Sequence, residues 1–181
     1  MLARPEAAKT DINVDQDKTF SFAGLRTWAW SPNGAGDVLA AVSADTDVKR
    51  IEGRVVPVLM PAIEREMAAR RFLKAEGKPD LYLRYYVLAT VGQTSQFHGQ
   101  FVPTVPEWGL PPFAPSTSAL SIYPVGTLII DVTSTSRNAI VWRGSAKRQL
   151  SVERPDEERR AVLEKAVRDL IKRIPEADKP A

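Results

Sequence analysis

The chain has 181 residues, of which 44% are hydrophobic, so it holds enough apolar material for one domain whose core needs no disulfide or metal. Its net charge of +3 comes from acids and bases that are interspersed, and this pattern argues against nucleic-acid binding. It has no cysteine, which excludes disulfides, thiolate nucleophiles and thiolate zinc sites. No signal peptide and no lipobox cysteine are found, and no apolar run reaches the roughly 18 residues that span a bilayer.

The first part of the chain predicts strands. Residues 1–11 are expected to form a flexible leader because they are small and polar. Residues 12–15 and 20–30 are rich in β-branched and aromatic side chains, which favours two strands. The composition of residues 31–34 is typical of a turn, and a loose stretch is expected from there to residue 46.

The next segment has helical periodicity that two prolines interrupt. A proline inside a helix removes a backbone donor and clashes with the preceding turn, at a cost of about 3 kcal/mol. Pro57 and Pro61 therefore predict a firm helix only from about Val56 to Arg71, with Pro57 in its first turn. Any helix before Val56 is expected to be a separate or kinked piece.

The second half predicts a strand, a long loop, a hairpin and a helix. Residues 81–88 form a strong strand pattern, and residues 126–133 and 139–150 alternate as two strands joined by a short connection. Residues 93–123 hold a cluster of prolines and are too long for an ordinary connection, which favours a functional or disordered loop. Asp156 is a candidate N-cap for a final amphipathic helix.

These elements predict an α+β fold with an antiparallel-dominated sheet of four or five strands and two helices packed on one face. We expect a single domain over residues 12–175, followed by a tail over residues 176–181. The order of the strands does not follow from the sequence.

Three stretches of the chain resemble a known family. They are Phe22–Trp30 (FAGLRTWAW), Ala62–Phe72 (AIEREMAARRF) followed by Pro79–Leu81 (PDL), and Gly126–Val132 (GTLIIDV) followed by Val141–Ala146 (VWRGSA). In this order and spacing they are similar to the bacterial lipoprotein family catalogued as domain of unknown function 4136. The resemblance covers roughly residues 12–175.

The resemblance implies a place in the cell envelope, periplasmic or associated with the outer membrane, and no assigned biochemical activity. Family members are usually anchored by a lipidated N-terminal cysteine that follows a signal peptide. This chain departs from that pattern because it has neither feature, and Pro57 and Pro61 are unusual for the family's helix.

Few residue patterns indicate catalysis or metal binding. His98 is the single histidine, and no serine lies in a nucleophile elbow beside it. Asp131 is expected to pair with Arg143 across two neighbouring strands as a structural ion pair, although an unfamiliar active site of Asp131, Arg143 and His98 stays an alternative. Asp11, Asn13, Asp15 and Asp17 carry oxygen ligands but lack the spacing of a calcium loop, so no metal site is predicted.

The long loop contains the candidate contact residues. Phe97, Phe101, Trp108 and Phe113 are large aromatic side chains in a segment that should lie at the surface. They are expected either to fold back onto the sheet as a lid or to form a contact surface for protein, peptide or lipid.

We therefore expect a non-catalytic envelope protein with no cofactor, acting as a protein-interaction or envelope-maintenance module. The suspected partner is an envelope protein or a lipid. The alternative is a small-molecule or lipid carrier with a pocket between the sheet and residues 93–123. The oligomeric state does not follow from the sequence.

Overall fold

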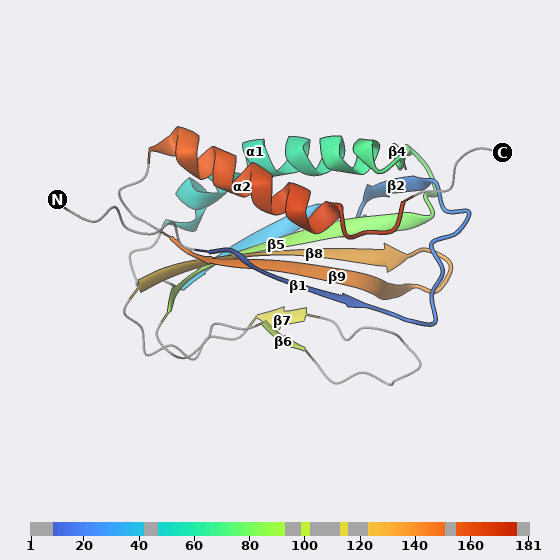
Figure 1. Cartoon of the computed structure of the whole chain (residues 1–181), viewed down its shortest axis with the longest axis horizontal. Coiled ribbons are helices and arrows are strands. Elements are labelled where there is room, and N and C mark those ends of the chain that lie inside the picture. The colour runs from blue at the N-terminus through green and yellow to red at the C-terminus, as the bar shows by residue number, and fades with distance from the viewer. Residues whose placement is uncertain are drawn as a thin grey trace.

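The fold is one twisted sheet with two helices on one side (Figure 1). A computed structural model describes residues 9–41, 47–92, 99–101, 113–115, 123–150 and 155–176. The sheet has seven strands: β1 (Asp11–Gln16), β2 (Thr27–Trp30), β3 (Gly36–Ala41), β4 (Leu73–Lys74), β5 (Leu81–Gly92), β8 (Tyr123–Ser134) and β9 (Ala139–Gln149). The helices are α1 (Val48–Ala69) and α2 (Asp156–Ile171). A separate pair, β6 (Gly99–Phe101) and β7 (Phe113–Pro115), lies on the side of the sheet that is opposite the helices (Figure 1).

The sheet has an antiparallel half and a parallel half. Strands β1, β9, β8 and β5 follow one another in antiparallel pairs, and β8 is joined to β9 by the predicted hairpin. The other edge of β5 is shared by β2, which pairs with Leu81–Leu83, and by β3, which pairs with Tyr85–Thr90. Both pairings are parallel, and β4 adds a short parallel pair beyond β2. The expected four or five antiparallel-dominated strands were therefore wrong, because three short parallel strands complete the sheet.

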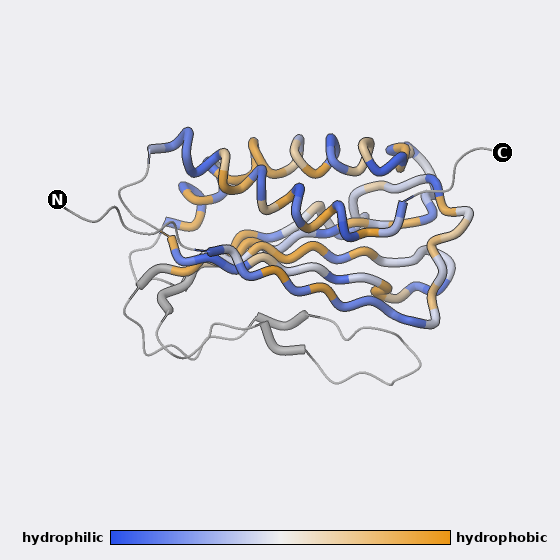
Figure 2. Tube along the Cα trace, viewed as in Figure 1, coloured by the Kyte–Doolittle hydropathy of each residue, from blue (hydrophilic) through white to orange (hydrophobic). Residues whose placement is uncertain are grey.

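The core lies between the sheet and the two helices. Hydrophobic and hydrophilic residues alternate along the strands (Figure 2), so each strand turns one apolar row toward the helices. Side chains with no measurable exposure come from both layers: Leu59, Ile63, Met67, Leu81, Leu83, Ile130, Trp142, Val167, Leu170 and Ile171. Burying each such aliphatic side chain contributes about 1.5–3 kcal/mol to stability, which makes this layer the main source of folding energy.

Helix α1 corrects the prediction that a firm helix begins near Val56. It starts at Val48, where the Asp47 side chain accepts a hydrogen bond from Arg50 N, and it contains both Pro57 and Pro61. The two prolines are four residues apart and exposed, so both lie on the solvent side of the helix. The carbonyl groups that lose their donors therefore face water, while the buried face of the helix stays continuous.

Two further local predictions were wrong. Within residues 20–30 only Thr27–Trp30 form a strand, because Gly24 adopts a left-handed φ of 78° that ends extended structure before it. The loose stretch expected up to residue 46 contains strand β3. A Cβ at Gly36 would lie 2.4 Å from the Tyr85 carbonyl oxygen, so the chain can approach β5 there only with glycine.

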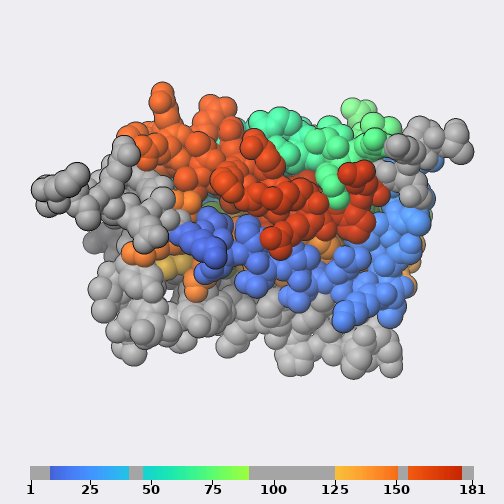
Figure 3. Space-filling view, in the orientation of Figure 1, coloured from blue at the N-terminus to red at the C-terminus, as the bar shows by residue number. Residues whose placement is uncertain are grey.

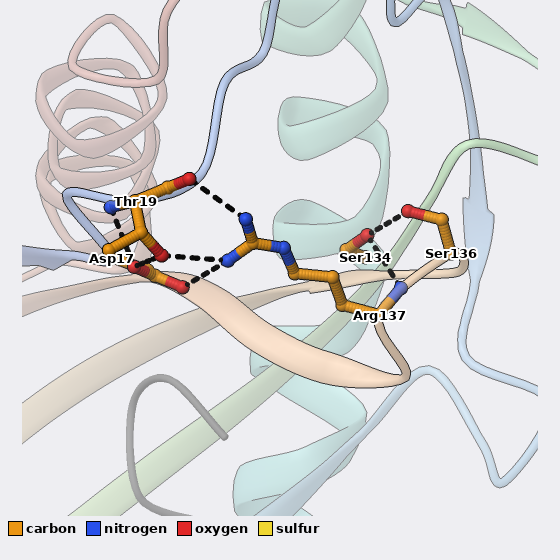
Figure 4. A network of polar contacts seen from close by, with 5 residues as sticks. All are labelled: Asp17, Thr19, Ser134, Ser136 and Arg137. Carbon is orange, nitrogen blue, oxygen red and sulfur yellow. Dashed lines mark hydrogen bonds and ion pairs between the residues drawn. The ribbon is translucent and has the colours of Figure 1, made fainter. Parts of the chain in front are cut away.

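One polar network fixes the β8–β9 hairpin to the segment that follows β1 (Figure 4). The Arg137 guanidinium donates to the Asp17 carboxylate at 2.8 Å, to the Thr19 hydroxyl at 2.9 Å and to the Thr19 carbonyl at 2.8 Å. Hydrogen bonds from Thr19 lower the pKa of Asp17, and the charge of Arg137 lowers it further. The network binds the end of the β1 edge to the hairpin.

Candidate functional site

A row of alternating charges crosses the sheet on the face that points away from the helices. The register places Asp15 of β1 opposite Arg143 of β9, Arg143 opposite Asp131 of β8, and Asp131 opposite Arg84 of β5. Leu83 and Tyr85, the neighbours of Arg84 along the strand, belong to the core beneath the helices, so Arg84 points the other way. We call Asp15, Arg143, Asp131 and Arg84 the charge row, and the sheet face that carries it the charged face.

The centre of the charge row is a buried ion pair. Arg143 Nε lies 2.5 Å from Asp131 Oδ1, and Arg143 Nη2 lies 2.6 Å from Asp131 Oδ2. The two residues are 2% and 3% exposed. Burial raises the pKa of Asp131, while the hydrogen bonds and charge of Arg143 and the charge of Arg84 act to lower it. The predicted cross-strand pair is confirmed, and its two-point geometry compensates for much of the cost of removing both charges from water.

Arg84 forms the partly open end of the row. Its Nη2 donates to Asp37 Oδ2 of β3 at 2.6 Å, and its Nη1 donates to the Asn33 carbonyl at 3.3 Å. Its guanidinium also lies 5.6 Å from the centre of the Tyr86 ring. The hydrogen bond with Asp37 raises the pKa of Arg84, so the guanidinium keeps its charge. Asp37 thus extends the acid–base alternation onto a fifth strand.

The charged face also buries apolar side chains. Leu88 and Ile129 are buried there and pack with the half-buried Tyr86. The Thr127 hydroxyl lies beside them, buried and without a hydrogen-bond partner among the residues that the structure describes. An antiparallel sheet with helices on one face usually turns polar, solvated side chains outward on the other. This face instead has the mixed composition of a covered or contact surface.

The geometry of the row favours positioning over proton transfer. Both Asp131 oxygens accept from Arg143, and the nearest acid to Arg84, Asp37, is paired with it. A general acid or base must be free to form a hydrogen bond with the substrate and to exchange a proton with it. His98, the third member of the alternative active site, lies outside the described residues. Within the described ranges no three histidine, aspartate or glutamate side chains gather in a way that would hold a metal ion.

Two of the four predicted contact aromatics lie in the β6–β7 pair. Phe101 ends β6, Phe113 begins β7, and their Cα atoms are direct partners in the register. Phe97 and Trp108 lie outside the described residues. The β6–β7 pair and the charged face are on the same side of the sheet (Figure 1). Whether the aromatics act as a lid or as an outer contact surface stays a prediction.

Two of the three stretches that resemble the family meet at the start of β5 and on α1. Asp80 Oδ2 accepts from Arg26 N, Thr27 N and the Thr27 hydroxyl at 2.8–2.9 Å, and Asp80 N donates to the same hydroxyl at 3.0 Å. Burial alone would raise the pKa of Asp80, but these hydrogen bonds lower it overall. Glu64 accepts from Trp30 Nε1 at 3.1 Å and pairs with Lys74 at 2.6 Å. These contacts hold β2 and β4 in place, so the motifs have a structural role.

Sequence reasoning missed Arg84 and Asp37. An arginine in the apolar run Leu81–Leu88 was a signal for a buried or paired charge, since such a residue is seldom placed in a strand core without a partner. Asp37 had no such signal, because its strand was not predicted and its partner is 47 residues away.

The comparison with family models shows the family of this chain. The sequence profile of the family described as "Domain of unknown function (DUF4136)" matches residues 12–176. A comparison with curated proteins found no match. No helix within the described ranges has the length and apolar character to cross a membrane.

Solved structures match the chain at low sequence identity. A PDZ domain protein from Parabacteroides distasonis ATCC 8503 is 12% identical with a TM-score of 0.52; the match covers 90% of this chain but 36% of that one, so this chain spans about a third of that protein. A DUF4136 family protein from Bacteroides thetaiotaomicron VPI-5482 is 13% identical over 88% of this chain and 92% of that one, with a TM-score of 0.46. The PelC dodecamer from Paraburkholderia phytofirmans is 8% identical over 94% of this chain and 100% of that one, with a TM-score of 0.42. At these identities the first match shows a shared fold alone.

Proposed function

The chain belongs to the DUF4136 family, whose function is unknown, and from its site we propose that it is a non-catalytic binding module of the bacterial cell envelope. The observation that carries the proposal is the arrangement of one side of the molecule. The charged face and the β6–β7 pair lie together on the side that has no helices (Figure 1).

Paired charges support binding over chemistry. On the charged face the buried Arg143 is paired with Asp131 and the partly exposed Arg84 with Asp37, so these charges are held in fixed positions. Such groups position a surface and select partners by charge complementarity, whereas they offer little to a reacting substrate. Tyr82 and Tyr86, both half-buried on this face, add the aromatic character that contact surfaces favour.

The partner we propose is another envelope protein, contacted through the β6–β7 pair. A β-ribbon in a proline- and aromatic-rich segment suits protein recognition, because proline lowers the entropy that the segment loses on binding. Envelope location rests on the family resemblance. Fractionation of the native bacterium tests it directly, since a protein recovered in the cytoplasmic fraction would contradict the proposal.

Site-specific photocrosslinking tests the contact. A photoreactive amino acid is placed at Gln100 of β6 or Ala114 of β7, and at Glu157, which is exposed on α2, as the matched control. We expect a protein adduct in intact cells from the first two positions and none from the third. Equal adducts from all three positions, or none from the ribbon, would refute a contact at this site. Adducts with phospholipid in place of protein would favour the carrier alternative.

A further inference from the structure

Two edge strands of the sheet, β1 and β3, differ in how well they are protected. A strand at a sheet edge exposes unpaired backbone groups, and proteins usually guard it with charges, prolines, bulges or covering elements. Strands β1, β3 and the two-residue β4 each pair with a single neighbour in the described part of the chain, so all three are edges, and β1 and β3 are the longer ones. The comparison between them indicates which edge is available for pairing.

The outward backbone groups of β3 can be identified from its ladder. Tyr85 N donates to the Ala35 carbonyl at 3.0 Å, and the parallel register pairs Asp37 with Tyr86. In a parallel ladder alternate residues bond to the same neighbour, so Ala35, Asp37 and Leu39 bond to β5. Gly36, Val38 and Ala40 therefore point their N–H and C=O groups away from the sheet, and these groups make no hydrogen bond among the described residues.

The side chains of β3 do not guard this edge. Within its described side chains, Gly36 to Ala40, it has no lysine, arginine or proline, and its one charge, Asp37, is paired with Arg84. Leu39 is 37% exposed, and among the described strand residues the other exposed large aliphatic side chain is Leu73 of β4, at 67%. Helix α1, which contacts β3, has the half-buried Val48 and Ile51 in its first turns.

Strand β1 is guarded against pairing with itself. An antiparallel pair of β1 strands centred on Asn13 would place Asp11 of one copy opposite Asp15 of the other, so like charges would meet twice. Helix α2 also lies directly against β1 (Figure 3). An antiparallel pair of two β3 strands brings no like charges together, because Asp37 lies away from the centre of the strand.

We propose that β3 is a self-association edge, at which two copies of this chain pair their β3 strands antiparallel to form one continuous sheet. In the register we assign, Leu39 lies opposite Leu39 of the second copy at a non-hydrogen-bonded position, where side chains approach most closely. Val38 of each copy then exchanges two hydrogen bonds with Ala40 of the other, which satisfies outward groups and covers the exposed Leu39. This inference goes beyond the partner contact proposed for the β6–β7 pair and does not depend on it.

A proline at Ala40 tests the edge without breaking the fold. Because the Ala40 N–H points outward, Ala40→Pro removes a donor needed for the dimer and leaves the β3–β5 ladder intact. The matched control is Gln16→Pro on β1. Asp17 N donates to the Val141 carbonyl of β9, and in an antiparallel pair alternate residues bond to the same neighbour. The N–H of Gln16 therefore points away from the sheet, as that of Ala40 does. Sedimentation over a wide range of protein concentration should show a monomer–dimer equilibrium for the wild type and for Gln16→Pro, and a monomer for Ala40→Pro.

A cysteine reporter tests the register and does not rely on the proline variant folding. The chain has no cysteine, so Leu39→Cys introduces a single thiol. At mild oxidation this variant should form a disulfide-linked dimer at least about tenfold faster than Asn13→Cys on the other edge, because closely opposed Cβ atoms meet the geometry of a disulfide. A wild type that stays monomeric at every concentration, or equal rates for the two cysteine variants, would overturn the proposal.

Discussion

The two faces of the sheet are buried by different side chains. Toward α1 and α2 the fully buried residues are aliphatic and aromatic, among them Leu83, Ile130 and Trp142. On the charged face the most buried residues include Asp131 and Arg143. An apolar layer tolerates swaps that conserve volume, whereas a buried ion pair requires both of its members. We therefore expect the two sides of the sheet to respond differently to substitution. A change of side-chain volume should destabilise the apolar side, and the loss of one charge of the pair should destabilise the charged face.

The largest expected effect is the loss of one member of the buried pair. Asp131→Ala leaves the Arg143 charge buried without its partner, and we expect a loss of about 3–5 kcal/mol in the free energy of unfolding. The double variant Asp131→Leu with Arg143→Met removes both charges and should be much closer to the wild type. Urea denaturation of the three proteins measures both effects. A single variant that costs less than about 1 kcal/mol would mean that the charged face is well hydrated.

The apolar side should instead be sensitive to volume. A Cβ on Gly144 would lie 2.4 Å from the Trp142 ring and 3.0 Å from Leu170 of α2, so Gly144→Ala overpacks the layer between β9 and α2. We expect a loss of about 1–3 kcal/mol. Gly53→Ala is the control, because nothing lies within 4 Å of its added Cβ and alanine favours a helix by about 1 kcal/mol over glycine. Thermal unfolding should move in opposite directions for the two variants; a shared direction would contradict the packing argument.

The elements that supply most of the apolar layer are also the ones that the sequence predicts best. Strand β5, the β8–β9 hairpin and α2 carry regular apolar periodicity, so local patterns were enough to identify them. The Asp131–Arg143 pair followed from the same hairpin register. Each of these features depends on contacts within one strand, one helix or two adjacent strands.

Features set by distant contacts were missed. Strand β3 has small residues and little alternation, and it becomes a strand by parallel pairing with β5, about 50 residues later in the chain. Its Asp37 therefore could not be joined to Arg84 from the sequence. The predicted start of helix α1 was too late for a similar reason. Tertiary packing of the buried face of the helix outweighs the cost of its two solvent-facing prolines.

The contacts at the start of β5 predict a pH dependence. The pKa of Asp80 is lowered in the folded state from its ordinary value of 3.8, because three donors stabilise the carboxylate. A lowered folded pKa contributes stability above the unfolded pKa, and this stability is lost as the pH falls through the folded pKa. Asp80→Asn should cost about 1 kcal/mol at pH 7, and the gap to the wild type should narrow below pH of about 3.8. A gap that is constant down to pH of about 2 would contradict the assigned cause.

The smallest effect should come from an exposed pair, which serves as the reference for the buried one. Arg160 Nε lies 3.2 Å from Glu164 Oε1 one turn along α2, and the arginine side chain is 66% exposed. A double-mutant cycle with alanine should give a coupling of about 0.3–0.5 kcal/mol at low salt. That coupling should vanish at 1 M salt, where the screening length is about 3 Å, because water and ions surround both groups. The coupling of Asp131 with Arg143, measured by the same cycle, should change little with salt, since ions cannot enter between two buried charges. If the two couplings fell together with salt, the charged face would be as open to solvent as the outer surface of α2.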